Sequence, residues 1–211
     1  NGVRVLGVNV PRGEVLAARE SGCRCSALLP GADPGRQLRL LQLLQPGAKR
    51  VGVLVTEQNQ WFGARLADAA EASDLALDLV RIADREELAP ALGRLLPRVD
   101  ALLALEHTGL YDPGSARLVL LTSYRQRRPV IGPDRAFVRA GSLATTYSGD
   151  DHRARSIAGW LERVRDGQPL PEPDWPTHFA VTLNEHVARA YDLPAQDPQW
   201  LAAELRDREA Q

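Results

Sequence analysis

Polar side chains that could hold a small molecule follow several short apolar runs of the chain, at the point where each run ends. The runs are RVGVLV, VDALLAL, RRPVIG and SLATT. Because parallel strands have their carboxyl ends at one edge of a sheet, where open α/β sheets bind ligands, we expect the side chains after these runs to share a binding site. The candidates are Glu57, Asn59, Trp61, Glu106, His107, Tyr111, Asp134, Tyr147 and Ser148.

These side chains offer the groups that a small polar molecule needs. A carboxylate at Glu106 or Asp134 could pair with an ammonium group, and Asn59 and Ser148 could orient polar atoms of a ligand. An alternative stays open for each of them, because such residues are also common in loops and helix caps. Under that alternative Glu57, Asn59 and Ser148 shape their own loops, and Asp134 closes a turn.

Aromatic side chains near the same strand ends could pack against an apolar part of a ligand. Tyr111 and Trp61 are the candidates, since each combines a large apolar ring with a polar tip. Trp61 could instead be the first buried residue of the helix that follows it. Trp160 falls on the apolar stripe of its own helix, so we expect it in the core.

Motifs for catalysis are missing from the sequence. There is no G-x-S-x-G turn, no phosphate loop ending in G-K-S/T, no H-E-x-x-H and no G-x-G-x-x-G after a strand. Cys23 and Cys25, in the tripeptide CRC, would point to one face of a strand. We interpret them as small buried hydrophobic residues, with a strained disulfide or half of a soft-metal site as alternatives. We therefore expect a protein that is not an enzyme and that uses no cofactor or metal.

The charge balance argues against two classes of partner. The 211 residues include 26 Lys and Arg against 27 Asp and Glu, a formal net charge of −1. Such a balance gives no overall attraction to nucleic acid or to an anionic membrane. No run of the sequence approaches the roughly 20 apolar residues that a membrane-spanning helix requires. We expect a chain that binds no nucleic acid and does not itself span a membrane.

The spacing of apolar residues predicts the elements that must position the candidate side chains. A leucine-rich stretch over 36–47 predicts a helix, and Asp112 before a proline predicts the start of another. The middle of the chain alternates strands and helices as βαβαβ, which implies parallel strands joined by right-handed crossovers. The predicted elements are a strand from 51, a helix over 62–73, a strand over 75–82, a helix over 84–96 and a strand over 99–106.

Several segments, taken in order, resemble a known family. They are QLRLLQLLQPGAKRVGVLV, VDALLALEHTGLY, RRPVIGPDRAFVRAGSLATTYSGDD, GWLERVRDGQPLP and FAVTLNEHVARAYDL. The ordered set resembles the periplasmic substrate-binding proteins of ABC importers, in the family that includes aromatic-amino-acid binders. The match is collinear over about residues 1–208, and the order of the segments is more specific than any one of them.

The resemblance implies an α/β fold of the type 1 periplasmic-binding class, with Rossmann-like lobes built on parallel sheets. Members of ordinary size begin their first lobe with several βα units before anything that corresponds to VRVLGVNV, so it also implies an incomplete first lobe. The expected division is a remnant of the first lobe over 1–45, the second lobe over 46–140, and crossing segments shared between the lobes over 141–211. The absence of Met and the start on a predicted strand favour the removal of upstream sequence, a signal peptide among it.

The resemblance further implies a function outside the cytoplasm. It favours the periplasmic solute-binding component of an ABC importer, which would bind a small, amino-acid-like organic molecule in a cleft between the lobes and deliver it to a membrane permease. An alternative from a different class is a sensor or protein-interaction module that derives from the same fold and captures no solute.

Overall fold

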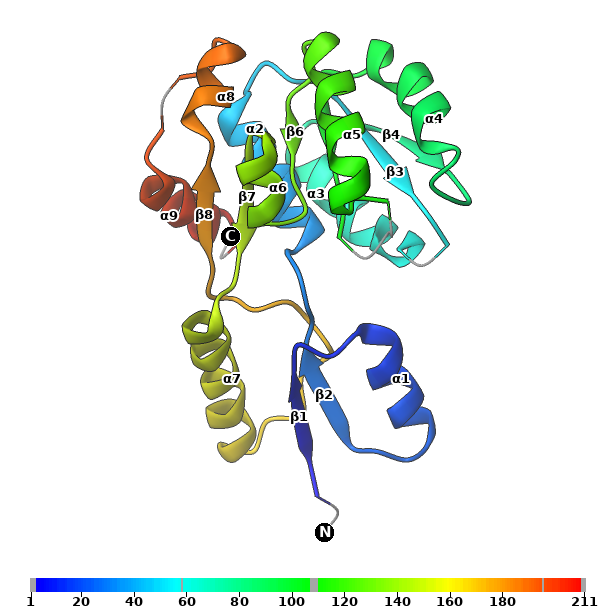
Figure 1. The fold of residues 1–211 in the computed structure, drawn as a ribbon. Helices are drawn as coiled ribbons and strands as arrows, with labels where there is room; N and C mark the ends of the chain where they lie inside the picture. Colours follow the sequence, from blue (N-terminus) through cyan, green and yellow to red (C-terminus); the bar gives the residue numbers. More distant parts are fainter. Residues whose placement is uncertain (1–2, 58, 107–109, 195, 210–211) are drawn as a thin grey trace. The chain divides into compact units, whose positions relative to one another are not determined.

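The computed structural model describes residues 3–57, 59–106, 110–194 and 196–209 (Figure 1). The chain forms two compact units, each discontinuous in sequence. Unit 1 consists of Asn1–Gly31 and Tyr147–Ala180, and unit 2 consists of Ala32–Thr146 and Val181–Gln211. The chain therefore crosses from one unit to the other after Gly31, after Thr146 and after Ala180.

Unit 2 is built on a six-stranded sheet with the order β4-β3-β5-β6-β7-β8. The pairs β3–β4, β3–β5, β5–β6 and β6–β7 are all parallel, with Val51 opposite Leu77 on one side and Ala101 on the other. The α/β fold with a largely parallel sheet is as predicted. The strands are β3 (Arg50–Val55), β4 (Ala76–Arg81), β5 (Ala101–Leu103), β6 (Val130–Ile131), β7 (Ala144–Tyr147) and β8 (Ala180–Leu183).

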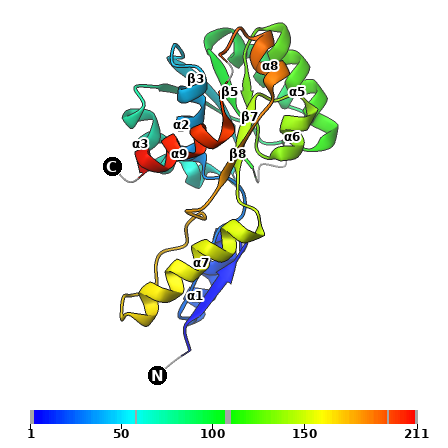
Figure 2. The same cartoon turned by 90° about the vertical axis from the view of Figure 1, so that its left-hand side faces the viewer.

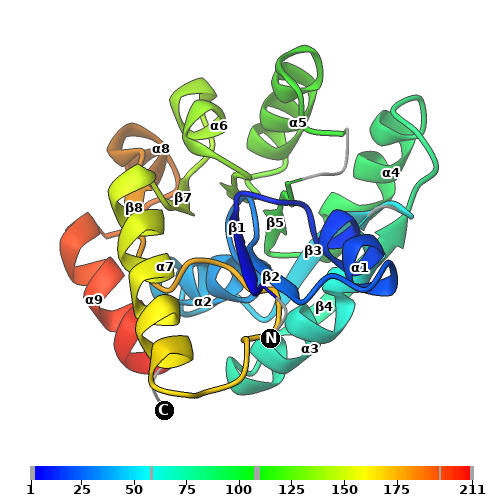
Figure 3. The same ribbon diagram turned by 90° about the horizontal axis from the view of Figure 1, so that it is seen from below.

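Helices cover both faces of this sheet, as the view in Figure 3 shows. One layer consists of α4 (Leu88–Leu95), α5 (Pro113–Arg125) and α6 (Arg135–Ala140), whose inner side chains join an apolar cluster with Leu54, Leu102 and Val130 of the sheet. The other layer consists of α2 (Pro34–Leu44), α3 (Gly63–Ala72) and α9 (Pro198–Glu209). The remaining helical elements of unit 2 are η1 (Gln60–Phe62), η2 (Leu96–Arg98) and α8 (Glu185–Ala190).

The leucine-rich stretch forms α2, as predicted, and almost the whole helix is buried. The helix packs against α3 and α9, and it belongs to unit 2. The expected division placed this stretch in the first lobe and ended the second lobe at 140, whereas unit 2 consists of Ala32–Thr146 and Val181–Gln211. The two units divide the chain differently because a helix belongs with the elements that cover its apolar face, and the sequence pattern does not reveal which elements those are.

Two predicted helix starts have different outcomes. Asp112 caps α5 as expected: its carboxylate accepts a hydrogen bond from the Ser115 amide, and the Ser115 hydroxyl accepts one from the Asp112 amide. Asp84 does not start a helix. Its carboxylate accepts from the amides of Glu86 and Glu87 and closes a turn, and α4 begins only at Leu88.

Unit 1 contains a parallel pair of strands, β1 (Val5–Val8) and β2 (Cys25–Leu28), with α1 (Arg12–Glu20) and α7 (Asp150–Arg165) packed against it (Figure 2). Its small apolar cluster contains Val15, Cys25 and Ala27. Cys25 is buried, Cys23 is half-buried and both thiols are free, and Trp160 is buried as predicted. None of the helices in the described parts of the chain is both long enough and apolar enough to cross a membrane.

Candidate functional site

The carboxyl ends of β3, β4, β5 and β6 lie at one edge of the sheet of unit 2, because these strands are parallel. Six of the nine predicted residues follow these strands. They are Glu57, Asn59, Trp61, Glu106, Tyr111 and Asp134. Tyr147 and Ser148 belong to unit 1, and His107 lies outside the described residues.

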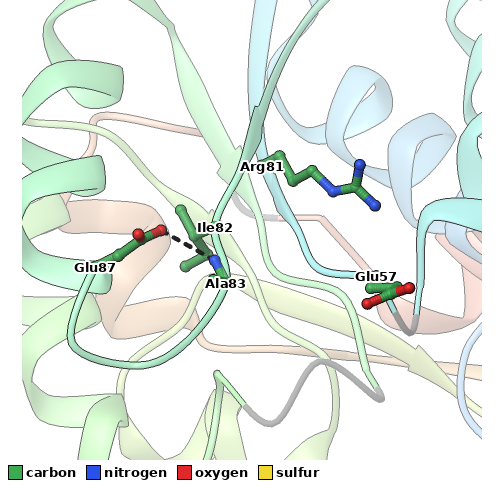
Figure 4. A pocket seen from close by; sticks show the side chains of 5 residues that line it. All are labelled: Glu57, Arg81, Ile82, Ala83 and Glu87. Atoms are coloured by element: carbon green, nitrogen blue, oxygen red, sulfur yellow. Dashed lines mark hydrogen bonds between the residues drawn. The ribbon is translucent and has the colours of Figure 1, made fainter.

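A pocket of about 580 Å³ lies where β3 and β4 end (Figure 4). Its lining residues are Glu57, Arg81, Ile82, Ala83 and Glu87. Arg81 donates one hydrogen bond to the side chain of Gln60 at 2.7 Å, and Glu87 accepts one from the Ala83 amide at 3.0 Å. Within the described parts of the chain the Glu57 carboxylate makes no hydrogen bond or ion pair. The pocket thus holds a carboxylate and a guanidinium that do not neutralise each other.

Arg81 is a residue that the sequence reasoning missed. It is the last residue of β4, and Ile82 and Ala83 follow it into the pocket. The strand was predicted correctly from LALDLVRI, but no candidate was taken from its end. The same strand-end rule that selected Glu57 after β3 would have selected Arg81 after β4.

Asn59 shapes the turn that presents Glu57. It is fully buried, and its side-chain oxygen accepts a hydrogen bond from the Thr56 amide at 2.8 Å. The Asn59 carbonyl accepts another bond from the Phe62 amide at 3.0 Å, at the start of η1. These contacts agree with the alternative in which Asn59 shapes its own loop. The side chain is fully buried, and its hydrogen bond fixes the backbone of the turn.

The two aromatic candidates are placed differently. Trp61 is half-buried, with its ring centroid 4.3 Å from that of Phe62. Tyr111 packs edge-on against Phe137, at 5.9 Å between centroids, and joins the apolar cluster under α4, α5 and α6. Burial raises the pKa of the Tyr111 phenol, which therefore stays neutral at physiological pH. Tyr111 serves the core of this layer, and Trp61 has the more accessible ring.

Asp134 caps α6, since its carboxylate accepts a hydrogen bond from the Phe137 amide at 2.8 Å. It remains exposed, while Glu106, where β5 ends, is half-buried. In unit 1, Ser148 is buried and its hydroxyl donates to the His178 carbonyl at 2.9 Å. The ring of Tyr147 packs edge-on against His152. Asp134 and Ser148 are thus already engaged in local hydrogen bonds of the kind that caps and loops use.

Gln37 of α2 fixes the ends of β6 and β7, and the sequence reasoning missed it too. Its side-chain nitrogen donates to the Gly132 carbonyl at 2.8 Å and to the Thr145 hydroxyl at 2.7 Å. Its side-chain oxygen accepts from the Thr146 amide at 2.8 Å. The side chain is 2% exposed, so these bonds form away from water. In the sequence, a glutamine on the apolar side of a leucine-rich helix would have indicated a side chain that makes buried hydrogen bonds to the sheet.

A buried charge network holds the start and the middle of α2. Asp33 is fully buried; its carboxylate caps the helix through the Gly35 amide and pairs with the Arg65 guanidinium at 2.5 Å. Burial opposes ionisation of Asp33, but the bond from Arg65 and the charge of Arg36 outweigh it and lower the pKa of that carboxyl. Arg36 in turn makes two bonds to Glu209 of α9, at 2.7 and 3.0 Å. The network ties α2 to α3 and α9.

Comparisons with known proteins agree with this architecture. No protein-family model matches the chain, and no curated protein is similar to it in sequence. Among solved structures, an ABC domain in complex with L-Trp from Streptococcus pneumoniae matches with a TM-score of 0.65 and 15% identity, over 85% of this chain and 62% of that one. The ligand-free, open structure of a substrate-binding protein with adhesive properties from Clostridium difficile matches with a TM-score of 0.62 and 18% identity, over 83% of this chain and 61% of that one.

The same fold also occurs in a different functional class. A putative LacI-family transcription repressor from Corynebacterium glutamicum matches with a TM-score of 0.50 and 14% identity, over 87% of this chain and 72% of that one. The chain therefore has the type 1 periplasmic-binding fold, as the resemblance implied. It spans about 62% of the length of the first of these structures. Identities this low show the shared fold and leave function to be argued from the site.

Proposed function

We propose that the chain is the solute-binding component of an ABC importer, acting outside the cytoplasmic membrane, and that it binds a small, amino-acid-like molecule without catalysis. The observation that carries this proposal is the pocket at the carboxyl ends of β3 and β4, where Glu57 has no partner among the described residues. Ligands of open α/β folds bind at this edge of the sheet. The partner that receives the solute would be a membrane permease.

The charges of the pocket support an amino-acid-like ligand. The Glu57 carboxylate suits an ammonium group, and the Arg81 guanidinium has donors left over that suit a carboxylate. The two side chains line the same pocket without pairing, so a molecule with both charges would satisfy both. The complex of the Streptococcus pneumoniae domain with L-Trp is consistent with this class of ligand.

Binding without chemistry agrees with the way the hydroxyl groups near histidines are used. Among the described residues, the hydroxyls of Ser156 and Thr177 each lie 3.3 Å from the Nδ1 atom of His178, contacts that resemble those of a nucleophile and its base. The Ser156 hydroxyl, however, donates to the His152 carbonyl at 2.9 Å and accepts from the His178 amide at 3.1 Å. Because this hydroxyl already donates to one backbone group and accepts from another, it has a structural role in unit 1.

Thermal unfolding of the purified protein with each of the proteinogenic amino acids tests the proposal. A ligand at 100 times its dissociation constant stabilises a protein by about 2.7 kcal/mol, which is readily measured as a rise in Tm. Glu57→Gln and Arg81→Gln should each weaken a ligand found in this way by about tenfold. Glu71→Gln and Arg155→Gln are the matched controls, because both residues are exposed and neither lines the pocket.

The outcomes separate the two classes of function. Binding that the pocket variants weaken and the controls leave unchanged supports the solute receptor. Binding that Glu57→Gln and Arg81→Gln leave unchanged moves the site elsewhere. If no amino acid or related metabolite stabilises the protein, the receptor proposal is wrong and the sensor or interaction module takes its place.

A further inference from the structure

The helices α4, α5 and α6, which form one layer on the sheet of unit 2, have an unbalanced charge. They contain no Asp or Glu, although the chain as a whole carries a net charge of −1. The acidic residues nearby, Glu87, Asp112 and Asp134, stand just before these helices, at their N-terminal ends. The arginines of the helices are Arg94, Arg117, Arg125, Arg135 and Arg139.

Most of these arginines are unpaired. Arg94, Arg117, Arg125 and Arg139 are exposed, and none of them makes a hydrogen bond or ion pair within the described parts of the chain. Elsewhere on unit 2 an exposed arginine commonly has a carboxylate beside it, as Arg127 does with Asp192 at 2.8 Å. Guanidinium groups that have no partner in the described ranges of the chain are available to carboxylates of another molecule.

The middle helix of this layer also exposes an apolar stripe. Leu118, Leu121 and Tyr124 are 41%, 44% and 58% exposed. Residues spaced by three lie on one side of a helix, so the three side chains form a continuous row along α5. Arg117 and Arg125 stand next to the two ends of this row. Tyrosine and arginine around aliphatic side chains are the composition that protein interfaces favour.

We propose that the outer face of α4, α5 and α6 is a docking surface for an acidic amphipathic helix of a partner protein. In this arrangement apolar side chains of the partner would cover Leu118, Leu121 and Tyr124, and its carboxylates would pair with the flanking arginines. We call this set the arginine–leucine face: Arg94, Arg117, Leu118, Leu121, Tyr124, Arg125 and Arg139. The proposal is independent of the ligand pocket, because none of these residues lines it.

Charge argues against a second copy of the chain as the occupant. Two such faces together would bring the exposed arginines of both copies into one interface, and like charges that face each other disfavour association. Packing argues against a lipid surface. The apolar side chains are only about half exposed, and the ring of Tyr124 rests edge-on against Tyr191 at 6.1 Å between centroids. About half of each side chain is therefore already covered by the protein, which leaves little apolar surface for insertion into a bilayer.

Binding of a synthetic peptide tests the proposal on the whole protein. The probe is a helical peptide with leucine at heptad spacing and glutamate on both flanks, and the control peptide has lysine in place of every glutamate. The acidic peptide should bind and the basic one should not, by fluorescence anisotropy. The binding should weaken as salt is raised from about 0.05 to 0.5 M, because the arginines are exposed to solvent. Methyl NMR signals of Leu118 and Leu121 should shift on addition of the acidic peptide.

Variants locate the binding. Arg117→Glu combined with Arg125→Glu should weaken the acidic peptide by at least about tenfold. Leu121→Ser should also weaken it, although it changes no charge, which separates the apolar contact from general attraction between opposite charges. The matched control combines Arg24→Glu with Arg155→Glu, two exposed arginines of unit 1 that together give the same change of charge. It should leave the affinity unchanged.

Three results would overturn the proposal. The first is equal binding of the acidic and the basic peptide. The second is binding to vesicles of phosphatidylglycerol without binding to the peptide, which would assign the face to a lipid surface. The third is dimerisation in sedimentation experiments that Leu121→Ser abolishes, which would assign the face to a second copy of the chain.

Discussion

The two helical layers on the sheet of unit 2 are held in place by different kinds of contact. The layer with α4, α5 and α6 packs through a cluster of apolar side chains, and the arginines of its helices are exposed. In the other layer α2 is buried together with Asp33, Arg36 and Gln37, whose hydrogen bonds run to α3, α9 and the ends of β6 and β7. Apolar packing depends on volume, whereas buried hydrogen bonds depend on which atoms are donors and acceptors.

This difference assigns separate tasks to the two layers. The bonds of α2 are directional, so they fix the ends of β6 and β7 and hold α3 and α9 against α2. The apolar contacts of α4, α5 and α6 set the spacing of a layer whose outer face is free for other contacts. Changes that keep volume but alter polarity should therefore damage the α2 layer most.

The largest effect is expected from Gln37→Met, which keeps the size of the side chain and removes its hydrogen bonds. The Gly132 carbonyl, the Thr145 hydroxyl and the Thr146 amide would each lose a buried partner. We expect a loss of about 3 kcal/mol in the free energy of unfolding, measured by urea denaturation. The matched change in the other layer, Leu92→Met, should cost less than about 1.5 kcal/mol. Equal losses would remove the distinction between the layers.

A smaller loss, of about 2 kcal/mol at pH 7, is expected from Asp33→Asn, because it leaves Arg65 and Arg36 without the charge they surround. The loss is moderated because Arg65 is partly exposed. The pKa of Asp33 in the folded protein lies below the ordinary value of 3.8, so its stabilisation is complete above that pH and disappears as the pH falls through the lowered pKa. Urea denaturation at several pH values should show a flatter acid limb for the variant. An identical acid dependence in both proteins would contradict this account of Asp33.

Gly52→Ala tests how tightly the apolar layer is packed. An added Cβ atom at Gly52 would lie 2.9 to 3.2 Å from three side-chain atoms of Leu95. We expect overpacking to cost about 1.5 kcal/mol. Adding Leu95→Val should recover part of that loss. The double variant should therefore lose less free energy of unfolding than the two single variants lose together, by at least about 0.5 kcal/mol. If urea denaturation shows that the losses of the two single variants simply add, the contact between residues 52 and 95 does not limit the packing of this layer.

The smallest effect is expected from Leu121→Ser, on the outside of the same layer. Since Leu121 is 44% exposed and lies on the arginine–leucine face, its removal should change the free energy of unfolding by no more than about 0.5 kcal/mol. Thermal and urea unfolding should agree on this. A loss above about 1 kcal/mol would mean that the side chain stabilises the fold, and its exposure would then need no docking partner to explain it.

Elements with a strong local pattern could be predicted from the sequence. RVGVLV and LALDLVRI were predicted as strands because short apolar runs between polar segments leave few alternatives, and they form β3 and β4. The leucine spacing of α2 and the capping pattern of Asp112 at α5 were equally informative. These signals arise within a few neighbouring residues, where spacing and propensity act.

Contacts between distant residues could not be predicted in this way. The partners of Gln37 stand far along the chain, at Gly132, Thr145 and Thr146, so nothing near Gln37 in the sequence indicates them. Ser148 was assigned either a ligand contact or a loop role, and its bond to the carbonyl of His178, 30 residues further along the chain, could not be predicted from its neighbours. The position of Arg81 at the end of β4, by contrast, follows from the same strand-end rule that selects Glu57 after β3. The role of a polar side chain depends on its tertiary contacts, whereas the local sequence pattern indicates only where along an element it lies.

The interleaved order of the two units has a consequence for synthesis and for protein engineering. A ribosome makes β1, α1 and β2 first, then the whole of residues 32–146, and only afterwards α7, which packs against that first strand pair. The pair β1–β2 therefore lacks the helix α7 that packs against it until most of the other unit has been synthesised. Unit 2 is likewise completed late, because its elements β8 and α9 follow α7 in the chain. Neither unit can be obtained by cutting the chain once, so a shortened version of either needs two segments to be joined by a new linker.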